Sequence, residues 1–207
     1  MSASRVTIAQ RVAQIDVAFA DVVRVAGPPP KNSPTPVADR FATLVRSITY
    51  QLLATRAAAT IHERIVACCD GDVRDITILN VGIQPLRHAG LSQSKARAIV
   101  DLAHAVRDGR VRLARHGHMS DDEVSHELTQ VYGIGPWTAQ MYLMHTLARP
   151  DVWPSGDFGV RHGWSILHHL AEPITEAQLR PHGSPFRGVR SSVAWYCWRA
   201  VDLDRER

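Results

Sequence analysis

The spacing of apolar residues is the feature that most restricts what this chain can fold into. From Ala38 onward, valines, isoleucines and leucines recur with the period of a helix and do not alternate as in a half-buried strand. The prolines of "GPPPKNSPTP", which follow a first helical stretch, exclude helix and favour an extended connection up to about Pro36. We therefore expect an all-α fold with a boundary between lobes there. Helix starts are marked by a capping box, an N-cap serine and a first-position proline: Ser120 with Glu123, Ser92, and Pro136.

Composition narrows the class of protein further. The chain has 207 residues, with 24 Lys and Arg against 20 Asp and Glu and a pI of about 9.3. This mildly basic balance permits a polyanionic partner, although the sequence contains no dense basic run. The three cysteines include the adjacent pair Cys68 and Cys69, whose mutual disulfide would be strained, which indicates a reducing cytoplasm. No apolar run approaches the roughly 20 residues that cross a bilayer. We expect a cytoplasmic monomer with no membrane partner.

A short segment with two glycines lies between two predicted helices and reads "VYGIGPWTA", residues 131–139. Glycines at 133 and 135 allow positive φ and the close approach of another backbone. The open amide groups of this hairpin and the hydroxyl of Thr138 would then form a small site for a phosphate. The alternative is a tight turn that only joins two packed helices.

Five segments resemble one superfamily of DNA glycosylases, named for a helix-hairpin-helix and a following Gly/Pro-rich loop with an aspartate. The hairpin match is "LTQVYGIGPWTAQMYLMHTL", and "DVWPSGDFGVRHGW" supplies the loop with Pro154, Gly156 and Asp157 in order. "FATLVRSITYQLLATRAAATI" is similar to the helix that carries a wedge residue, and "AGLSQSKARAIVDLA" to a Gly-Leu-Ser…Lys-Ala segment. With "FRGVRSSVAWYCWRAV", the resemblance covers nearly everything after residue 38, and it is greatest to the DNA-3-methyladenine glycosylase II type.

The resemblance implies a two-lobed helix-hairpin-helix glycosylase fold, with an active-site cleft between the lobes and no N-terminal β domain. A single glycosylase domain would cover the chain, with a central lobe over 37–160 that includes the hairpin at 121–147. The second lobe would combine 1–36 with 161–207. The implied partner is double-stranded DNA containing alkylated bases, reached by base flipping in base excision repair, and the implied location is the cytoplasm, associated with the nucleoid.

Asp157 is the residue that matches the catalytic aspartate of the superfamily. Its position before "FGVRHGWSILHHL" is also that of an ordinary helix N-cap, and the two roles are compatible, because donors at a helix start favour an ionised carboxylate. Cleavage of an N-glycosidic bond builds positive charge on the sugar, which an anion stabilises; the same carboxylate could orient or deprotonate the attacking water. No second carboxylate stands out as a general acid, and an already cationic base such as 3-methyladenine or 7-methylguanine needs none.

A cationic base would be held by aromatic faces. The expected base pocket consists of Trp137, Trp198, Tyr50 and Met141, and a core position is the alternative for Tyr50 and for a further candidate, Trp153. Leu52 matches the wedge that fills the space of a flipped base, although a helical leucine is ordinarily core. The residues expected to bind DNA are Gln51, Leu52, Gly133, Gly135, Thr138 and Arg161.

The resemblance also implies a monovalent cation at the hairpin, held by the backbone carbonyls of Thr129, Val131 and Ile134. No cofactor is required, the four-cysteine iron–sulfur loop of other branches is absent from the sequence, and the eleven histidines, His168 and His169 among them, show no zinc spacing. Superfamily members that also cut the strand carry a lysine where this chain has Trp137, so we expect hydrolysis without lyase activity. The competing functions are a same-fold glycosylase for oxidised or mismatched bases and a DNA-damage-binding protein without catalysis.

Overall fold

The structure is a computed structural model that describes residues 3–206, and among them it contains helices and no strand. The expectation of an all-α fold is therefore confirmed. The chain divides into two compact units, Pro34–Leu147 and a second made of Met1–Ser33 with Ala148–Arg207. We call the first the hairpin unit and the second the terminal unit. The sequence placed 148–160 in the central lobe, whereas the structure assigns this stretch to the terminal unit. No helix in the described part is long and apolar enough to cross a membrane.

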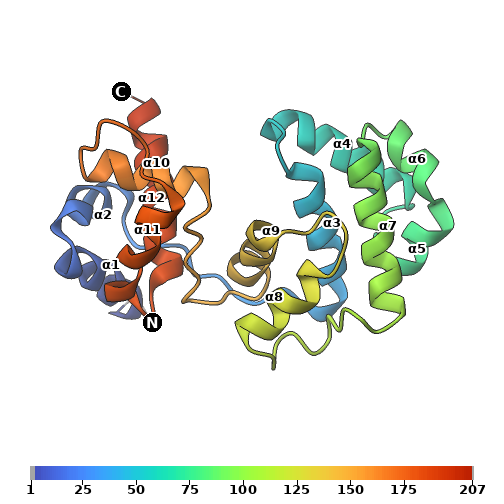
Figure 1. The fold of residues 1–207 in the computed structure, drawn as a ribbon, viewed down its shortest axis with the longest axis horizontal. Coiled ribbons are helices and arrows are strands. Elements are labelled where there is room, and N and C mark those ends of the chain that lie inside the picture. The colour runs from blue at the N-terminus through green and yellow to red at the C-terminus, as the bar shows by residue number, and fades with distance from the viewer. Residues whose placement is uncertain (1–2, 207) are drawn as a thin grey trace. The chain divides into compact units, whose positions relative to one another are not determined.

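The hairpin unit consists of seven helices around one core. Figure 1 shows α7 beside α5 and α6, and α7 also packs on α3. Helical apolar spacing brings Leu44, Ile48, Ile99, Leu102 and Leu128 into this core, where each is fully buried. The helices are α3 (Arg40–Tyr50), α4 (Thr55–Cys68), α5 (Asp75–Val81), α6 (Ile83–His88), α7 (Gln93–Arg107), α8 (Asp121–Thr129) and α9 (Pro136–Met141), and a π-helical turn, Tyr142–Thr146, extends α9.

One predicted helical stretch is interrupted in the structure. The spacing of apolar residues predicted helix from Ala38 to Cys69, but α3 ends at Tyr50 and α4 begins at Thr55. Gln51 takes an extended conformation, and Leu52 has a positive φ of 53°, which is uncommon for a residue with a side chain. The chain therefore turns sharply at the predicted wedge position.

The described part of the terminal unit packs five helices, and α10 lies against α12. Gly163 permits this contact, since a Cβ there would lie 1.9 Å from the carbonyl oxygen of Cys197. The predicted N-terminal helix ends near Gly27 as expected but is divided at Asp16, whose carboxylate accepts from the N–H of Ala18. The helices are α1 (Ala3–Ile15), α2 (Ala20–Ala26), α10 (Phe158–Leu167), α11 (Glu176–His182) and α12 (Arg190–Arg205), with short 3-10 turns at Val17–Phe19 and Ser184–Phe186 here and at Val37–Asp39 in the hairpin unit.

The helix starts that the sequence predicted are confirmed. Ser120 and Glu123 form a reciprocal capping box at α8, and the Ser92 hydroxyl accepts from the N–H of Lys95 at α7. Pro136 is the first residue of α9. These starts fix where the hairpin begins and ends along the chain.

A buried polar network braces the two helices of the hairpin. The fully buried His116 ring contacts Tyr142 Oη at 3.0 Å through Nδ1 and Glu127 Oε2 at 3.1 Å through Nε2. Arg112 donates to the same carboxylate from its backbone N–H and its guanidinium. Glu127 lies on α8 and Tyr142 directly follows α9, so the network ties both helices to the loop after α7.

Candidate functional site

The two hairpin glycines have different structural roles. Gly133 has a φ of +77°, and a Cβ there would lie 2.7 Å from the Cβ of Ala98 on α7, so both conformation and packing require glycine. Gly135 has a φ of −98° and a ψ of 178°, and a Cβ there would meet nothing within 4 Å. Gly135 therefore does not use the positive φ that a glycine allows, whereas Gly133 does. The residue before a proline is driven to the extended region, and Gly135 precedes Pro136.

The amide groups of the hairpin are divided between internal and open positions. The N–H of Tyr132 donates to Asp101 Oδ2 at 2.7 Å, and the N–H of Ile134 to the carbonyl of Val131 at 3.1 Å. No described residue accepts from the N–H groups of Gly133 and Gly135. These two donors, next to a position where an added side chain would meet open space, suit an anion such as a phosphate.

Gln51 and Thr138 hold the hairpin from within. Thr138 is 1% exposed, and its hydroxyl accepts from Gln51 Nε2 at 2.9 Å. The same Nε2 donates to the carbonyl of Gly133 at 3.1 Å. The sequence assigned both side chains to DNA contact, whereas the structure uses them to join the end of α3 to the hairpin. The burial of Thr138 and its hydrogen bond with Gln51 account for the difference.

Leu52 extends from the turn between α3 and α4, which we call the wedge turn, residues 51–53. Its side chain is 104% exposed, although an exposed leucine with positive φ gains neither burial nor an easy backbone conformation. A core position, the alternative left open by the sequence, is therefore excluded for Leu52. Lys95 on α7 donates from Nζ to the carbonyl oxygens of Thr49, at 2.8 Å, and of Gln51, directly before this residue.

Asp157 is the N-cap of α10 in the terminal unit, as predicted. Its Oδ1 accepts from the backbone N–H of Val160 and from Trp198 Nε1, both at 2.8 Å. The indole of Trp198 on α12 therefore orients the carboxylate from a second helix. Gly159, which the sequence analysis did not single out, makes room for this contact, because a Cβ there would lie 2.8 Å from Trp198 Cδ1 and 3.1 Å from Asp157 Oδ1.

The predicted aromatic residues differ in what they offer to a base. Trp137 in the hairpin unit is 38% exposed. Tyr50 already carries the guanidinium of Arg46, 5.0 Å from its ring centroid, and is less suited to a second cation. Met141 is only 9% exposed and belongs to the core, a correction to its predicted pocket role. Trp153 is buried and donates from Nε1 to the carbonyl of Leu179 at 3.3 Å, which confirms the core alternative.

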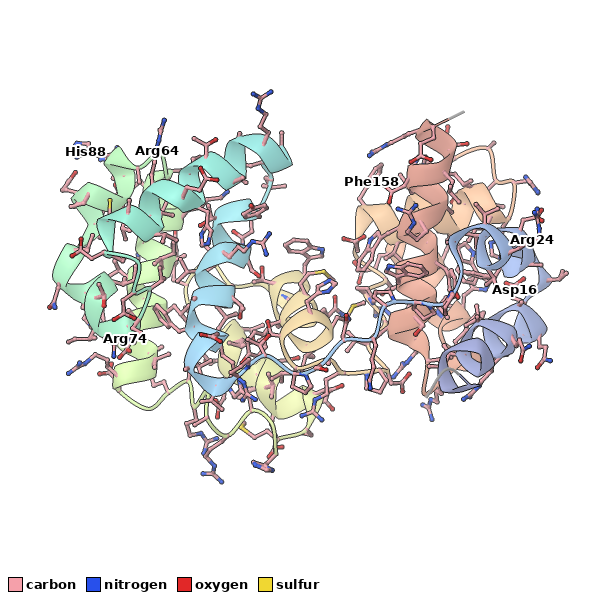
Figure 2. All side chains as sticks on the ribbon, turned by 180° about the vertical axis from the view of Figure 1, so that it is seen from behind. Asp16, Arg24, Arg64, Arg74, His88 and Phe158 are labelled. Atoms are coloured by element: carbon pink, nitrogen blue, oxygen red, sulfur yellow. The ribbon has the colours of Figure 1, made fainter. Side chains whose placement is uncertain are left out.

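Phe158 is an exposed aromatic residue that the sequence analysis missed. It follows Asp157 directly, is 61% exposed and stacks on the His162 ring with centroids 5.7 Å apart; Figure 2 labels it at the start of α10. Helix periodicity could have found it, because an apolar first residue of an amphipathic helix lies outside the buried stripe formed by Val160 and Trp164.

The remaining predicted residues are engaged with the protein itself. Arg161 donates from Nη1 to the carbonyl of Ile174 at 3.2 Å, and its guanidinium lies 5.6 Å from the Phe158 ring centroid. His168 is half-buried and contacts Asp16 Oδ2 and the carbonyl of Trp164, both at 2.8 Å, so both of its ring nitrogens are engaged within the protein. Among the described residues, no group of three His, Cys, Asp or Glu side chains is placed to hold a metal.

The hairpin carbonyls form a different kind of site. The Val131 carbonyl accepts one hydrogen bond, from Ile134, and a carbonyl oxygen has a second lone pair to offer. A set of neutral oxygens suits a hard monovalent cation. The predicted ligands at Thr129, Val131 and Ile134 thus fit such an ion chemically.

Within each unit the structure brings several predicted residues together. In the hairpin unit, Gln51 directly contacts Gly133 and Thr138. In the terminal unit, Asp157 contacts Trp198.

Comparison with known proteins gives consistent results. No family model matches the chain. The chain is 26% identical over 197 residues to DNA-3-methyladenine glycosylase 1 of Schizosaccharomyces pombe, covering 91% of this chain and 84% of the relative. The solved structure of the fission-yeast 3-methyladenine DNA glycosylase in complex with abasic DNA superposes with a TM-score of 0.86 at 26% identity, over 93% of this chain and 95% of that one. A DNA-3-methyladenine glycosidase from Bacillus halodurans gives 0.81 at 27% identity, over 95% and 91%. Over most of its length the chain is therefore similar to DNA glycosylases named for 3-methyladenine, and it shares the fold of their solved structures.

Proposed function

We propose that this protein is a DNA glycosylase that hydrolyses the N-glycosidic bond of alkylated purines in duplex DNA. The observation that carries the proposal is the carboxylate of Asp157, oriented by Val160 N–H and the Trp198 indole, in a chain similar over most of its length to named 3-methyladenine glycosylases. This is the residue that the motif assigns to catalysis, and two helices hold it in one orientation.

The chemistry follows from where charge develops. As the bond between C1′ of the sugar and the base breaks, its electron pair leaves with the base and the sugar becomes an oxocarbenium-like cation. Asp157 stabilises that cation electrostatically, and preorganised charge is most effective when it does not have to reorient. Water then bonds to C1′, and its proton passes to the carboxylate or to solvent.

The proposed substrate class follows from the leaving group. An alkylated purine such as 3-methyladenine or 7-methylguanine is already cationic, so it leaves as a neutral base without a general acid. Beside the Asp157 loop, the Glu176 carboxylate lies against Gly156 and is ion-paired with Arg180 at 2.9 Å. Trp137, which is 38% exposed in the hairpin unit, offers an aromatic ring to such a cationic base.

The end point of the reaction is an intact abasic site. A strand-cutting glycosylase needs an amine at C1′ to form a Schiff base. Trp137 has no such nitrogen, and the Lys95 amine is bound to two backbone carbonyls of the hairpin unit. Borohydride should therefore trap no covalent complex with DNA, and an adduct that disappears in a Lys95 or Lys31 variant would contradict this.

The duplex would be held at the hairpin through the N–H groups of Gly133 and Gly135. A monovalent cation on the carbonyls of Thr129, Val131 and Ile134 would add positive charge beside a phosphate. These contacts position the backbone and read no base, so they serve damaged and undamaged DNA alike.

The decisive experiment measures release of free base from duplexes containing 3-methyladenine or 7-methylguanine. Wild-type protein should release the base, and Asp157→Asn should not, although the asparagine can still cap α10 and the variant should bind DNA at least as tightly. Duplexes with oxidised or mismatched bases are run in parallel. Release only from those would favour the same-fold alternative, and tight binding of damaged DNA without release would favour a damage-binding protein. Near-normal turnover by Asp157→Asn would overturn the role of this carboxylate.

A further inference from the structure

Three residues on one face of α7 contact the functional segments of the hairpin unit. Lys95 binds the carbonyls of Thr49 and Gln51, Ala98 packs against Gly133, and Asp101 accepts from the N–H of Tyr132. Their spacing of three residues places them on the same side of the helix. One helix face therefore supports both the end of α3 and the hairpin.

Lys95 compensates the carbonyl groups that α3 leaves open at its C-terminus. The last carbonyls of a helix lack intrahelical donors and carry partial negative charge, so an ammonium group there is favourable. Burial lowers the pKa of Lys95, which indicates that the group is partly withdrawn from solvent. A long surface side chain would not be held there without the two acceptors.

The wedge turn has little else to hold it. Its internal hydrogen bonds, from Gln51 N–H to Ile48 and from Leu53 N–H to Tyr50, are both long at 3.4 Å. Leu52 is fully exposed with positive φ, so neither packing nor backbone preference maintains it. Gln51 adds the remaining link, from its side chain to the Gly133 carbonyl and the Thr138 hydroxyl.

We propose that Lys95 is a positioning residue that, together with the Gln51 side chain, locks the wedge turn to the hairpin and keeps Leu52 projected before DNA arrives. That Leu52 then fills the space of a flipped base rests on the function proposed above. Holding the leucine in advance reduces the ordering cost at the moment of flipping, because less of the segment has to be immobilised on binding. The hairpin and the wedge would thus reach the duplex as one rigid element.

The first test uses the protein without DNA. Amide hydrogen exchange of residues 51–53 is compared in wild type, in Lys95→Met, which removes both donors, and in Lys95→Gln, which retains an amide donor. Loss of two charge-assisted hydrogen bonds should accelerate exchange in Lys95→Met at least about tenfold, with a smaller effect in Lys95→Gln. Lys31→Met, which removes an exposed lysine of the terminal unit, is the matched control and should change nothing. Unchanged exchange in the folded Lys95→Met variant would overturn the proposal.

The second test measures the ratio of affinities for an abasic duplex and an intact duplex, a quantity independent of catalysis. Lys95→Met should reduce this preference by about tenfold and leave intact-duplex affinity unchanged, because the hairpin amides remain. A mere loss of stability would weaken both affinities equally. Accelerated exchange with an unaltered ratio would refute the coupling to the wedge. If wild-type protein showed no preference for the abasic duplex, the proposed function would fail, and the exchange experiment would still decide whether Lys95 holds the turn.

Discussion

Substituting the two hairpin glycines by alanine should separate DNA binding from folding. At Gly135 the backbone conformation is one that any residue adopts, and a Cβ meets nothing within 4 Å. Such a change stabilises a protein by about 0.4–1 kcal/mol, since it reduces the freedom of the unfolded chain. For a domain of this size, the melting temperature should rise by about 1–4 °C.

Gly133→Ala should have the opposite effect on stability. A left-handed conformation costs a residue with a side chain about 1–2 kcal/mol, and the added methyl would lie 2.7 Å from the Cβ of Ala98. Overpacking of this kind adds about 1–3 kcal/mol. The melting temperature should therefore fall by about 4–20 °C.

In Gly135→Ala, affinity for DNA should fall although the stability of the fold rises. A methyl group at Gly135 would keep a phosphate from approaching the open amides, and loss of one hydrogen bond to a charged group, about 1.5–3 kcal/mol, weakens binding by about 10- to 100-fold. The assay is fluorescence anisotropy with intact and abasic duplexes at one salt concentration, beside thermal melting. Gly117→Ala is the control, because a Cβ there makes only ordinary contact, 3.5 Å from Arg40, in the loop before α8.

The affinities of Gly135→Ala for the intact and the abasic duplex show whether the hairpin binds phosphate. Both duplexes should lose affinity for Gly135→Ala by the same factor, because phosphate contacts carry no information on the base. Full affinity in a stabilised Gly135→Ala variant would show that the hairpin is only a turn between packed helices. A loss confined to the abasic duplex would mean that the hairpin reads the lesion, contrary to the account of its amides given above.

Three further outcomes are expected. Leu52→Ala should leave intact-duplex affinity and thermal stability unchanged and slow single-turnover excision, whereas unchanged rates would exclude a wedge. Trp198→Phe keeps a ring but removes the hydrogen bond to Asp157 Oδ1, so kcat should fall about 10- to 100-fold with folding retained; an unaltered kcat would exclude an orienting role. Burial lowers the pKa of His116 in the folded protein, although Glu127 opposes the shift. As pH falls, the His116 imidazole is therefore protonated in the unfolded state before it is protonated in the folded state. The free energy of unfolding should decrease as pH falls below about 6.5. In His116→Gln, chemical denaturation should show a shallower dependence on pH in that range, and an identical pH profile would refute the assignment.

Local signals made much of the fold predictable. Capping at Ser120 and at Asp157 depends on residues within three positions, so the sequence contains all the interacting partners. The extended conformation of Gly135 was equally local, since it follows from the proline after it, and it could have been predicted. The catalytic candidate was found because its motif is a contiguous stretch.

The break between α3 and α4 could not be predicted in the same way. Apolar spacing continues through it, and the contact that holds the turn joins Gln51 to Lys95, 44 residues away. The inward orientation of Thr138 likewise depends on Gln51, 87 residues earlier in the chain. Such pairings arise from packing and leave no periodic trace, so a hydroxyl beside an open turn was assigned to the surface when it is buried.

In the hairpin, backbone carbonyl groups accept hydrogen bonds from within the unit, whereas two backbone N–H groups are open to a ligand. The carbonyls of Gly133 and Val131 each accept one hydrogen bond from within the unit, from the Gln51 side chain and from the N–H of Ile134. The N–H groups of Gly133 and Gly135, where no side chain screens the backbone, have no described acceptor. Because amide donors can hold a phosphate without a charged side chain, a protein that uses them does not need a large excess of lysine and arginine. A formal net charge of only +4 is therefore compatible with duplex binding, because the open amide donors of the hairpin can hold a phosphate in place of basic side chains.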